Sequence, residues 1–363
     1  MIEAVERPNG KLAEIETGLT APWVGRKHVL DLDDFSQEEI HAVLETADRM
    51  KEVLARPIRR VPALRGRSIV NLFYEASTRT RVSFEVAAKN LGADVVNVSA
   101  SGSSVEKGET LLDTVRTLRA LGADLLVMRH NHSGAPYTVA SHADIPVVNA
   151  GDGTHAHPTQ ALLDAYTIRE RFGKIEGLRV LIIGDIAHSR VARSNAWGLR
   201  ALGAEVTFCG PPTLLPPTTL SSEGDSPWDV GVDMDLDHAI EGVDVVMPLR
   251  VQLERQEGSR LASLRGYARD YAITRARLAR AAPHAIVMHP GPMNEGVEID
   301  ADVAHGLQSV VQDQVSNGVA IRMAVLYLLM AATHGGARGR ASGPSVAPLA
   351  NGIEHVSAAQ RRS

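Results

Sequence analysis

The stretch SIVNLFYEASTRTRVSFEVAAKNLGADVVNVS, residues 68–99, decides the fold. Its apolar run at 68–74 is typical of a buried strand, and its β-branched run at 94–99 predicts a second one. Between them, apolar residues recur at helical spacing over 80–91. A strand, a helix and a strand joined by short turns are the unit from which parallel sheets are built. The stretch therefore predicts a parallel sheet covered by helices.

The same alternation continues on both sides of this stretch. Ser36 and Glu39 form a capping-box pattern at the start of a helix expected over 36–54. The further segments expected are helices at 111–121, 158–172, 191–202 and 319–332, and strands at 125–128, 145–149, 179–183, 205–209, 244–247 and 285–288. We predict an α/β fold with two doubly wound parallel-sheet, Rossmann-like domains.

The expected domain organisation follows from where this alternation restarts and where it stops. The chain is divided into a mobile N-terminal extension at 1–27, a first domain at 28–165, a second domain at 166–315, a C-terminal helix at 316–333 and a disordered tail at 334–363. No internal repeat is apparent.

Composition excludes several classes of protein. The net charge of −5 gives no general attraction for nucleic acid or an anionic membrane, so neither is an expected partner. Cys209 is the only cysteine, in a strand-like run, which predicts a buried inert thiol and rules out an intrachain disulfide. The N-terminus is too acidic for a signal peptide, and the apolar run at 319–333 carries Arg322 and is shorter than the ~20 residues of a membrane span. A cytoplasmic location is expected.

The first strand end carries the residues Ser77-Thr78-Arg79-Thr80-Arg81 at the start of a helix. A helix N-terminus offers free N–H groups and a positive dipole end, and hydroxyl and guanidinium groups complete a phosphate site. The alternative is a plain helix cap at Ser77 with two solvated arginines. The glycines and lysine of a Walker phosphate loop are absent.

Two later strands of the first predicted domain are also followed by polar residues. Arg129 follows the strand at 125–128, and His157 and Gln160 begin the helix at 158–172. His157 and Gln160 suit a neutral polar substrate group. Alternatively, Asp152, His155 and His157 are the candidates for a metal site. A histidine that packs or caps locally is the third alternative.

In the second predicted domain, arginines and backbone carbonyls follow the strands. Arg190, Arg250 and Gln252 follow apolar strands, and two arginines suit two carboxylates. A dinucleotide site is disfavoured because GxGxxG is missing and no acidic residue ends the strand at 205–209. The prolines of His289-Pro290-Gly291-Pro292 leave backbone carbonyls facing outward, although a rigid turn without a ligand is the more common origin of such a pattern. The loop at 101–110, with Ser103 and Lys107, is either a mobile lid or an ordinary solvated loop.

Taken together, these motifs resemble the aspartate/ornithine carbamoyltransferase family in order and spacing, over about residues 28–332. The resemblance implies two α/β domains with C-terminal helices that return to the first domain. The loop around Lys107, the Arg250-x-Gln252 pair and His289-Pro290-Gly291-Pro292 are similar to the aspartate-using members. The His-Cys-Leu-Pro and Ser-Met-Gly motifs of the ornithine-using members are missing.

The resemblance implies carbamoyl transfer from carbamoyl phosphate to L-aspartate, an early step of pyrimidine biosynthesis, with no metal and no cofactor. By the same resemblance, phosphate and carbamoyl group are held by Ser77, Thr78, Arg79, Thr80, Arg129, His157, Gln160, Pro290 and Gly291, with Arg79, Thr80, Arg129 and His157 catalytic, and aspartate is held by Lys107, Arg190, Arg250 and Gln252. Ser103 and Lys107 would reach a neighbouring subunit, which implies a homotrimer; a larger assembly with a regulatory subunit or dihydroorotase stays open.

Two residues depart from the family pattern. Glu106 stands where some relatives have a second lysine, and Glu295 stands where many have arginine, which bears on the electrostatics of these loops. The alternative functions are a carbamoyltransferase for another amine and a non-catalytic protein that binds carbamoyl phosphate or another anion.

Overall fold

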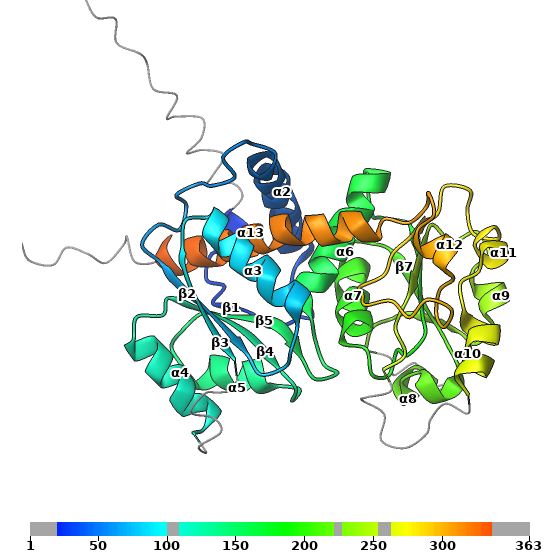
Figure 1. The fold of residues 1–363 in the computed structure, drawn as a ribbon, viewed down its shortest axis with the longest axis horizontal. Coiled ribbons are helices and arrows are strands. Elements are labelled where there is room, and N and C mark those ends of the chain that lie inside the picture. The colour runs from blue at the N-terminus through cyan, green and yellow to red at the C-terminus, as the bar shows by residue number, and fades with distance from the viewer. Residues whose placement is uncertain (1–19, 100–108, 221–226, 253–262, 336–363) are drawn as a thin grey trace, which may run out of the picture.

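The structure is a computed structural model that describes residues 20–99, 109–220, 227–252 and 263–335. It contains two parallel sheets of five strands each, side by side (Figure 1). The first has the order β1-β5-β4-β2-β3, and the second β10-β9-β6-β7-β8. Every strand pair is parallel, which confirms the predicted α/β class with two doubly wound sheets.

The first sheet is covered on both faces, because successive side chains of a buried strand point to opposite sides. Ile69 packs toward α2 and α3, whereas Val70 packs toward α4 and α5. The strands are β1 (His28–Val29), β2 (Ser68–Phe73), β3 (Asp94–Ser99), β4 (Leu125–His130) and β5 (Val147–Asp152), and the helices are α2 (Gln37–Leu54), α3 (Thr78–Asn90), α4 (Leu111–Ala120), α5 (Ala135–His142) and α6 (Pro158–Phe172).

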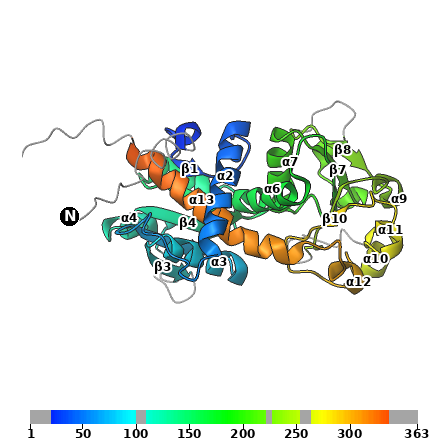
Figure 2. The ribbon, with the colours of Figure 1, turned by 90° about the horizontal axis from the view of Figure 1, so that it is seen from above.

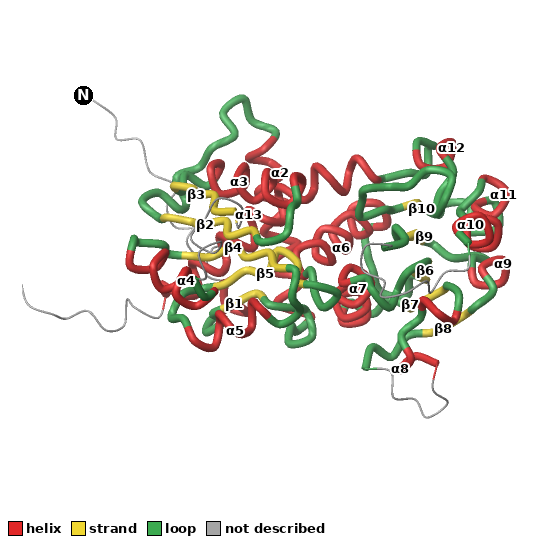
Figure 3. Tube along the Cα trace, turned by 60° about the horizontal axis from the view of Figure 1, so that its bottom comes forward, coloured by secondary structure: helices red, strands yellow, loops and turns green. Residues whose placement is uncertain are grey.

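The second sheet lies beyond α6, which packs against α7. One apolar core runs continuously from the first sheet through these two helices, including Leu162 and Leu199, into the second sheet. The strands are β6 (Arg179–Ile183), β7 (Glu205–Cys209), β8 (Gly231–Asp233), β9 (Val245–Pro248) and β10 (Ile286–Val287), and the helices are α7 (Arg190–Ala201), α8 (Pro217–Leu220), α9 (Leu236–Ala239), α10 (Leu264–Tyr271), α11 (Arg275–Leu278) and α12 (Ala301–Ala304). Figure 3 shows both sheets with their flanking helices.

The last helix, α13 (Val311–Gly335), returns across the first sheet and packs on α2, α3 and α6 (Figure 2). It begins earlier than the predicted 319–332, because Gln314 and Asn317 turn their polar side chains into buried hydrogen bonds with α6. Within the described residues, Val311–Thr333 is long and apolar enough to cross a membrane, so the predicted length was too short. Two thirds of its most apolar window is buried inside the protein, as in a core helix.

Three local predictions concern the capping box at Ser36, the N-terminal extension and Cys209. Ser36 Oγ accepts from Glu39 N at 3.2 Å and Glu39 Oε2 accepts from Ser36 N at 2.9 Å, so the predicted capping box is confirmed. The mobile extension at 1–27 stays a prediction, although its described part, 20–27, contacts α2. There the buried Trp23 donates its indole N–H to Glu39 O at 3.0 Å, and Arg26 pairs with Glu39. The prediction of a buried thiol at Cys209 is confirmed, and burial raises the pKa of this thiol to about 12.

Both sheets have a point where the strand order reverses. In the first sheet it lies between β2 and β4, and in the second between β6 and β9. Ligands of doubly wound sheets bind beyond the carboxyl ends of the strands at such points. The fold therefore directs attention to the loops after these four strands.

Candidate functional site

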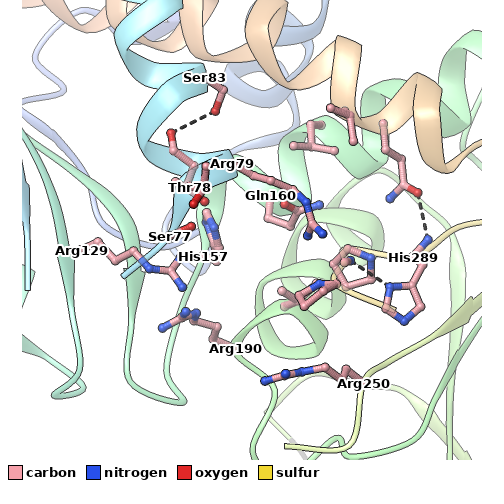
Figure 4. A pocket seen from close by; sticks show the side chains of 18 of the residues that line it. Ser77, Thr78, Arg79, Ser83, Arg129, His157, Gln160, Arg190, Arg250 and His289 are labelled. Atoms are coloured by element: carbon pink, nitrogen blue, oxygen red, sulfur yellow. Dashed lines mark hydrogen bonds between the residues drawn. The ribbon is translucent and has the colours of Figure 1, made fainter. Parts of the chain in front are cut away.

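A cavity of about 730 Å³ lies at both reversal points, between the two domains. Its walls are the loops after β2, β5, β6, β9 and β10, the end of β4 at Arg129, and the first halves of α3 and α13. The predicted site residues that line it are Ser77, Thr78, Arg79, Thr80, Arg129, His157, Gln160, Arg190, Arg250, Gln252, Pro290 and Gly291 (Figure 4). Ser103, Glu106 and Lys107 lie outside the described residues.

The first wall, formed by the first domain, includes the N-terminus of α3. Ser77 holds the N-cap position, yet its side chain makes no capping hydrogen bond, so the cap alternative does not describe it. The first turn contains no acidic residue, and it lines the cavity with the exposed Thr78 and Arg79 and the buried Thr80. This is the geometry of an anion site at a helix N-terminus.

Two buried arginines from different domains meet at one carboxylate. Glu75 Oε1 accepts from Arg129 Nη2 at 2.6 Å and from Arg190 Nη2 at 2.7 Å, and Glu75 Oε2 accepts from Arg190 Nη1 at 2.9 Å. The guanidinium groups come so close that a Cβ at Gly151 would lie 3.0 Å from both Arg129 Nη1 and Arg190 Nε. Sequence reasoning missed Glu75, although it stands within the motif that ends β2.

His157 is fixed by a chain of buried hydrogen bonds that starts at its backbone. Its N–H donates to Ser194 Oγ at 2.9 Å, and Ser194 Oγ donates to Asp31 Oδ1 at 2.7 Å. Burial raises the pKa of Asp31 to about 6. The imidazole, 4% exposed, stands at the start of α6.

The metal alternative at this strand end finds no support in the arrangement. Asp152 accepts from Gly134 N, Asn149 Nδ2 and Ala156 N, so its oxygens are committed to holding the loop. Its hydrogen bond with His155 raises the pKa of that imidazole. Among the residues that the structure describes, no three His, Cys, Asp or Glu side chains are placed to hold a metal ion.

The second-domain wall contributes Arg250 and Gln252 from the loop after β9. Gln252 N donates to Asp185 Oδ2 at 3.1 Å, and the other oxygen of this fully buried carboxylate bonds His188 Nδ1 at 2.6 Å. Asp185 thereby joins the loop after β6 to the loop after β9. Arg190 and Arg250 lie on the same side of the cavity in Figure 4.

The loop after β10 closes the cavity. Gly291 N donates to His289 Nδ1 at 2.8 Å, and His289 Nε2 contacts Glu298 Oε1 at 3.2 Å, so the imidazole proton sits on Nε2. His289 N donates to Gln314 Oε1 at 2.9 Å, which ties the loop to α13. Within the described part of the chain, no donor meets the carbonyl oxygens of Pro290 and Gly291.

The fold and cavity define an α/β protein in which arginine side chains from two domains line one cavity. Its first part, residues 27–170, matches the family model described as "Aspartate/ornithine carbamoyltransferase, carbamoyl-P binding domain". Residues 176–329 match "Aspartate/ornithine carbamoyltransferase, Asp/Orn binding domain". The chain belongs to the aspartate/ornithine carbamoyltransferase family, and the predicted family is confirmed.

Curated relatives and solved structures agree with this placement. The chain is 62% identical over 305 residues to a Roseiflexus sp. (strain RS-1) protein named aspartate carbamoyltransferase catalytic subunit, covering 84% of this chain and 95% of that one. A protein of the same name from Chloroflexus aggregans (strain MD-66 / DSM 9485) is 59% identical over 303 residues, covering 83% and 97%.

Two crystal structures share the fold. Aspartate transcarbamoylase from Trypanosoma cruzi, in complex with carbamoyl phosphate and aspartate, has a TM-score of 0.75 at 33% identity, covering 83% of this chain and 96% of that one. The catalytic subunit of M. jannaschii aspartate transcarbamoylase has a TM-score of 0.74 at 34% identity, covering 85% and 99%.

Proposed function

We infer that this protein transfers the carbamoyl group of carbamoyl phosphate to the amino group of L-aspartate, giving N-carbamoyl-L-aspartate and phosphate. The observation that supports this reaction is one cavity in which each domain supplies a different set of binding groups. The first domain supplies a helix N-terminus with hydroxyls and Arg129, and the second supplies Arg190, Arg250 and Gln252. The relatives' names, and the complex of the Trypanosoma cruzi enzyme with both substrates, support this reaction.

In this proposal the first domain holds carbamoyl phosphate. The phosphate lies at the N-terminus of α3 and is held by Ser77, Thr78, Arg79, Thr80 and Arg129. The carbamoyl NH2 group needs acceptors. They are Gln160 Oε1 and the carbonyl oxygens of the loop after β10, at Pro290 and Gly291.

The second domain holds aspartate. Arg190 and Arg250 each pair with a carboxylate, and Gln252 supplies an amide group beside them. Arg190 starts the cycle bonded to Glu75, so aspartate has to share or displace that contact. The predicted contribution of Lys107 to this subsite belongs to a residue outside the described part of the chain.

Catalysis is then positioning and charge stabilisation. The amine lone pair of aspartate attacks the carbamoyl carbon, and the carbonyl oxygen becomes an oxyanion that Thr80, Arg129 and His157 stabilise by donation. The C–O bond to phosphate breaks, phosphate leaves with the electron pair, and the amine gives up one proton. The leaving phosphate is itself a candidate acceptor for that proton.

The proposal extends to assembly and setting. We propose a homotrimer in which Ser103 and Lys107 reach the site of the neighbouring subunit, as the family resemblance implies. We also propose a cytoplasmic location and a role early in pyrimidine biosynthesis. Light scattering tests the trimer: a monomeric mass for fully active protein would contradict shared sites.

Arg129→Ala and His157→Ala test the assignment of the first wall. Each is expected to lower kcat about 10²- to 10³-fold, the cost of one lost oxyanion donor. Arg250→Ala is the matched change in the second wall, expected to act through the KM for aspartate. Near-normal turnover by either first-wall variant, in protein with native circular dichroism, would refute the role assigned to it.

A further inference from the structure

A fully buried carboxylate lies behind the carbamoyl side of the cavity and takes no direct part in the proposed reaction. Asp164 is one helical turn after Gln160 on α6 and is 0% exposed. Its Oδ1 accepts from Gln160 Nε2 at 3.0 Å and from Gln314 Nε2 at 2.8 Å, and its Oδ2 accepts from Asn195 Nδ2 at 2.8 Å. One side chain thus gathers three amides from α6, α13 and α7.

A carboxylate only accepts hydrogen bonds, so every amide that meets it must present its NH2 end. This fixes which way each amide points. Gln160 has to turn its Oε1 away from Asp164, toward the cavity that the side chain lines. Gln314 has to turn its Oε1 away as well, and that oxygen accepts from His289 N at 2.9 Å.

The second of these contacts reaches the loop after β10. His289 precedes Pro290 and Gly291, whose carbonyl oxygens the proposed function assigns to the carbamoyl NH2 group. A hydrogen bond to His289 N holds the start of this loop against α13. The orientation of one carboxylate therefore controls both kinds of acceptor, the Gln160 amide directly and the loop carbonyls through Gln314.

This arrangement needs an ionised carboxylate at Asp164. All three hydrogen-bond partners of Asp164 are NH2 donors, which suits an ionised carboxylate, although burial raises the pKa of Asp164 to about 6. Arg322 on α13 lies close enough to oppose this rise, although burial lowers its own pKa to about 10. An ionised carboxylate at this depth is costly to bury, and a well-packed apolar side chain is often the more stable solution.

We propose that Asp164 is a positioning residue that makes the site recognise the NH2 group of carbamoyl phosphate, by turning Gln160 and, through Gln314, the 289–292 loop so that oxygens face that group. This inference rests on the proposed function, which assigns the acceptors. A site with the Gln160 amide reversed would present NH2 to NH2, two donors that repel.

Two stable phosphonates that differ in one group test this directly. Phosphonoacetamide carries the NH2 group, and 2-oxopropylphosphonate carries a methyl group in its place. The measured quantity is the ratio of their dissociation constants on full-length protein, by calorimetry at pH 7.5. In the unmodified protein, phosphonoacetamide is expected to bind at least tenfold more tightly, because the methyl compound leaves buried acceptors unpaired.

Asp164→Leu is expected to bring this ratio close to one while affinity for 2-oxopropylphosphonate changes less than threefold, because it removes the oxygen that both Gln160 Nε2 and Gln314 Nε2 meet. Gln314→Leu, which removes only the loop contact, is expected to lower the ratio in part and stands in if Asp164→Leu does not fold. Leu162→Ala is the matched control, a buried apolar residue of the same helix, and should leave the ratio unchanged.

Gln160→Ala separates this inference from the function beneath it. If Gln160→Ala keeps the full ratio, the acceptor assignment fails and the inference falls with it. If Gln160→Ala lowers the ratio but Asp164→Leu and Gln314→Leu do not, only the positioning role is overturned. Equal weakening of both phosphonates by Asp164→Leu would show a structural role alone and would equally overturn it.

Discussion

Gly291→Ala perturbs the site through a single methyl group. Gly291 has φ +67°, a left-handed conformation that side chains other than glycine rarely adopt. A Cβ built there lies 2.9 Å from Arg79 Cζ and closer still to Nη1. The Arg79 side chain is exposed, so it can swing away without unfolding the domain.

Two costs follow, and they are separable. The left-handed conformation costs alanine about 1–2 kcal/mol of stability. Displacing the Arg79 guanidinium removes the hydrogen bond to phosphate that the proposed function assigns to it, about 1.5–3 kcal/mol, which is about a 10- to 150-fold loss in kcat/KM. Gly177 has a similar φ of +73° with no atom within 4 Å of its built Cβ, so Gly177→Ala carries the first cost without the second.

The assay compares urea unfolding and initial rates with carbamoyl phosphate varied at saturating aspartate. Both variants should lose about 1–2 kcal/mol of unfolding free energy, and only Gly291→Ala should lose kcat/KM for carbamoyl phosphate. Equal kinetics in the two variants would refute the view that the loop after β10 presses against the phosphate-binding Arg79.

Three further outcomes are expected. Arg250→Ala should raise the KM for aspartate about 10- to 100-fold while calorimetric affinity for carbamoyl phosphate stays the same; a weaker carbamoyl phosphate complex would move Arg250 to the other substrate. Ser194→Ala leaves His157 N and the Asp31 carboxylate short of a partner, so urea unfolding should show a loss of about 2–4 kcal/mol, and a loss under 0.5 kcal/mol would argue for a replacement partner such as water. Asp164 has its pKa raised from 3.8 to about 6, so its contribution to stability is present below pH 4 and lost as pH rises through 6. Asp164→Asn should therefore gain about 3 kcal/mol in unfolding free energy relative to the unmodified protein between pH 4 and pH 7, and parallel pH curves would contradict a raised pKa at Asp164.

Local patterns in the sequence predicted the elements that carry the site. β3, β6, β7 and α6 have the predicted bounds, because β-branched runs and a proline at the first helical turn leave little choice. Short elements were missed: β1 has two residues, and α5 follows Gly134 in the left-handed conformation without a helical apolar pattern. The first turns of α13 were missed because Gln314 and Asn317 are polar, and only the fold reveals that they face α6.

The candidate site was likewise predicted only in part. Its residues were found because parallel strands deliver their carboxyl ends to one edge, so strand ends could be searched one by one. The contacts among them could not be found, since they join distant segments. Glu75 meets Arg190 across 115 positions of the chain and Asp164 meets Gln314 across 150. An acidic residue beside a phosphate motif looks like a solvated side chain until both arginines are seen to converge on it.

The central claim is that one cavity joins carbamoyl phosphate to aspartate. The most direct test is carbamoyl transfer measured with L-aspartate, with L-ornithine as a parallel acceptor and no added metal. The account predicts N-carbamoyl-L-aspartate and phosphate in equal amounts with aspartate, and no product with ornithine. Turnover with another amine alone would contradict the assignment of Arg190, Arg250 and Gln252, and no turnover with any acceptor would contradict the enzymatic function itself.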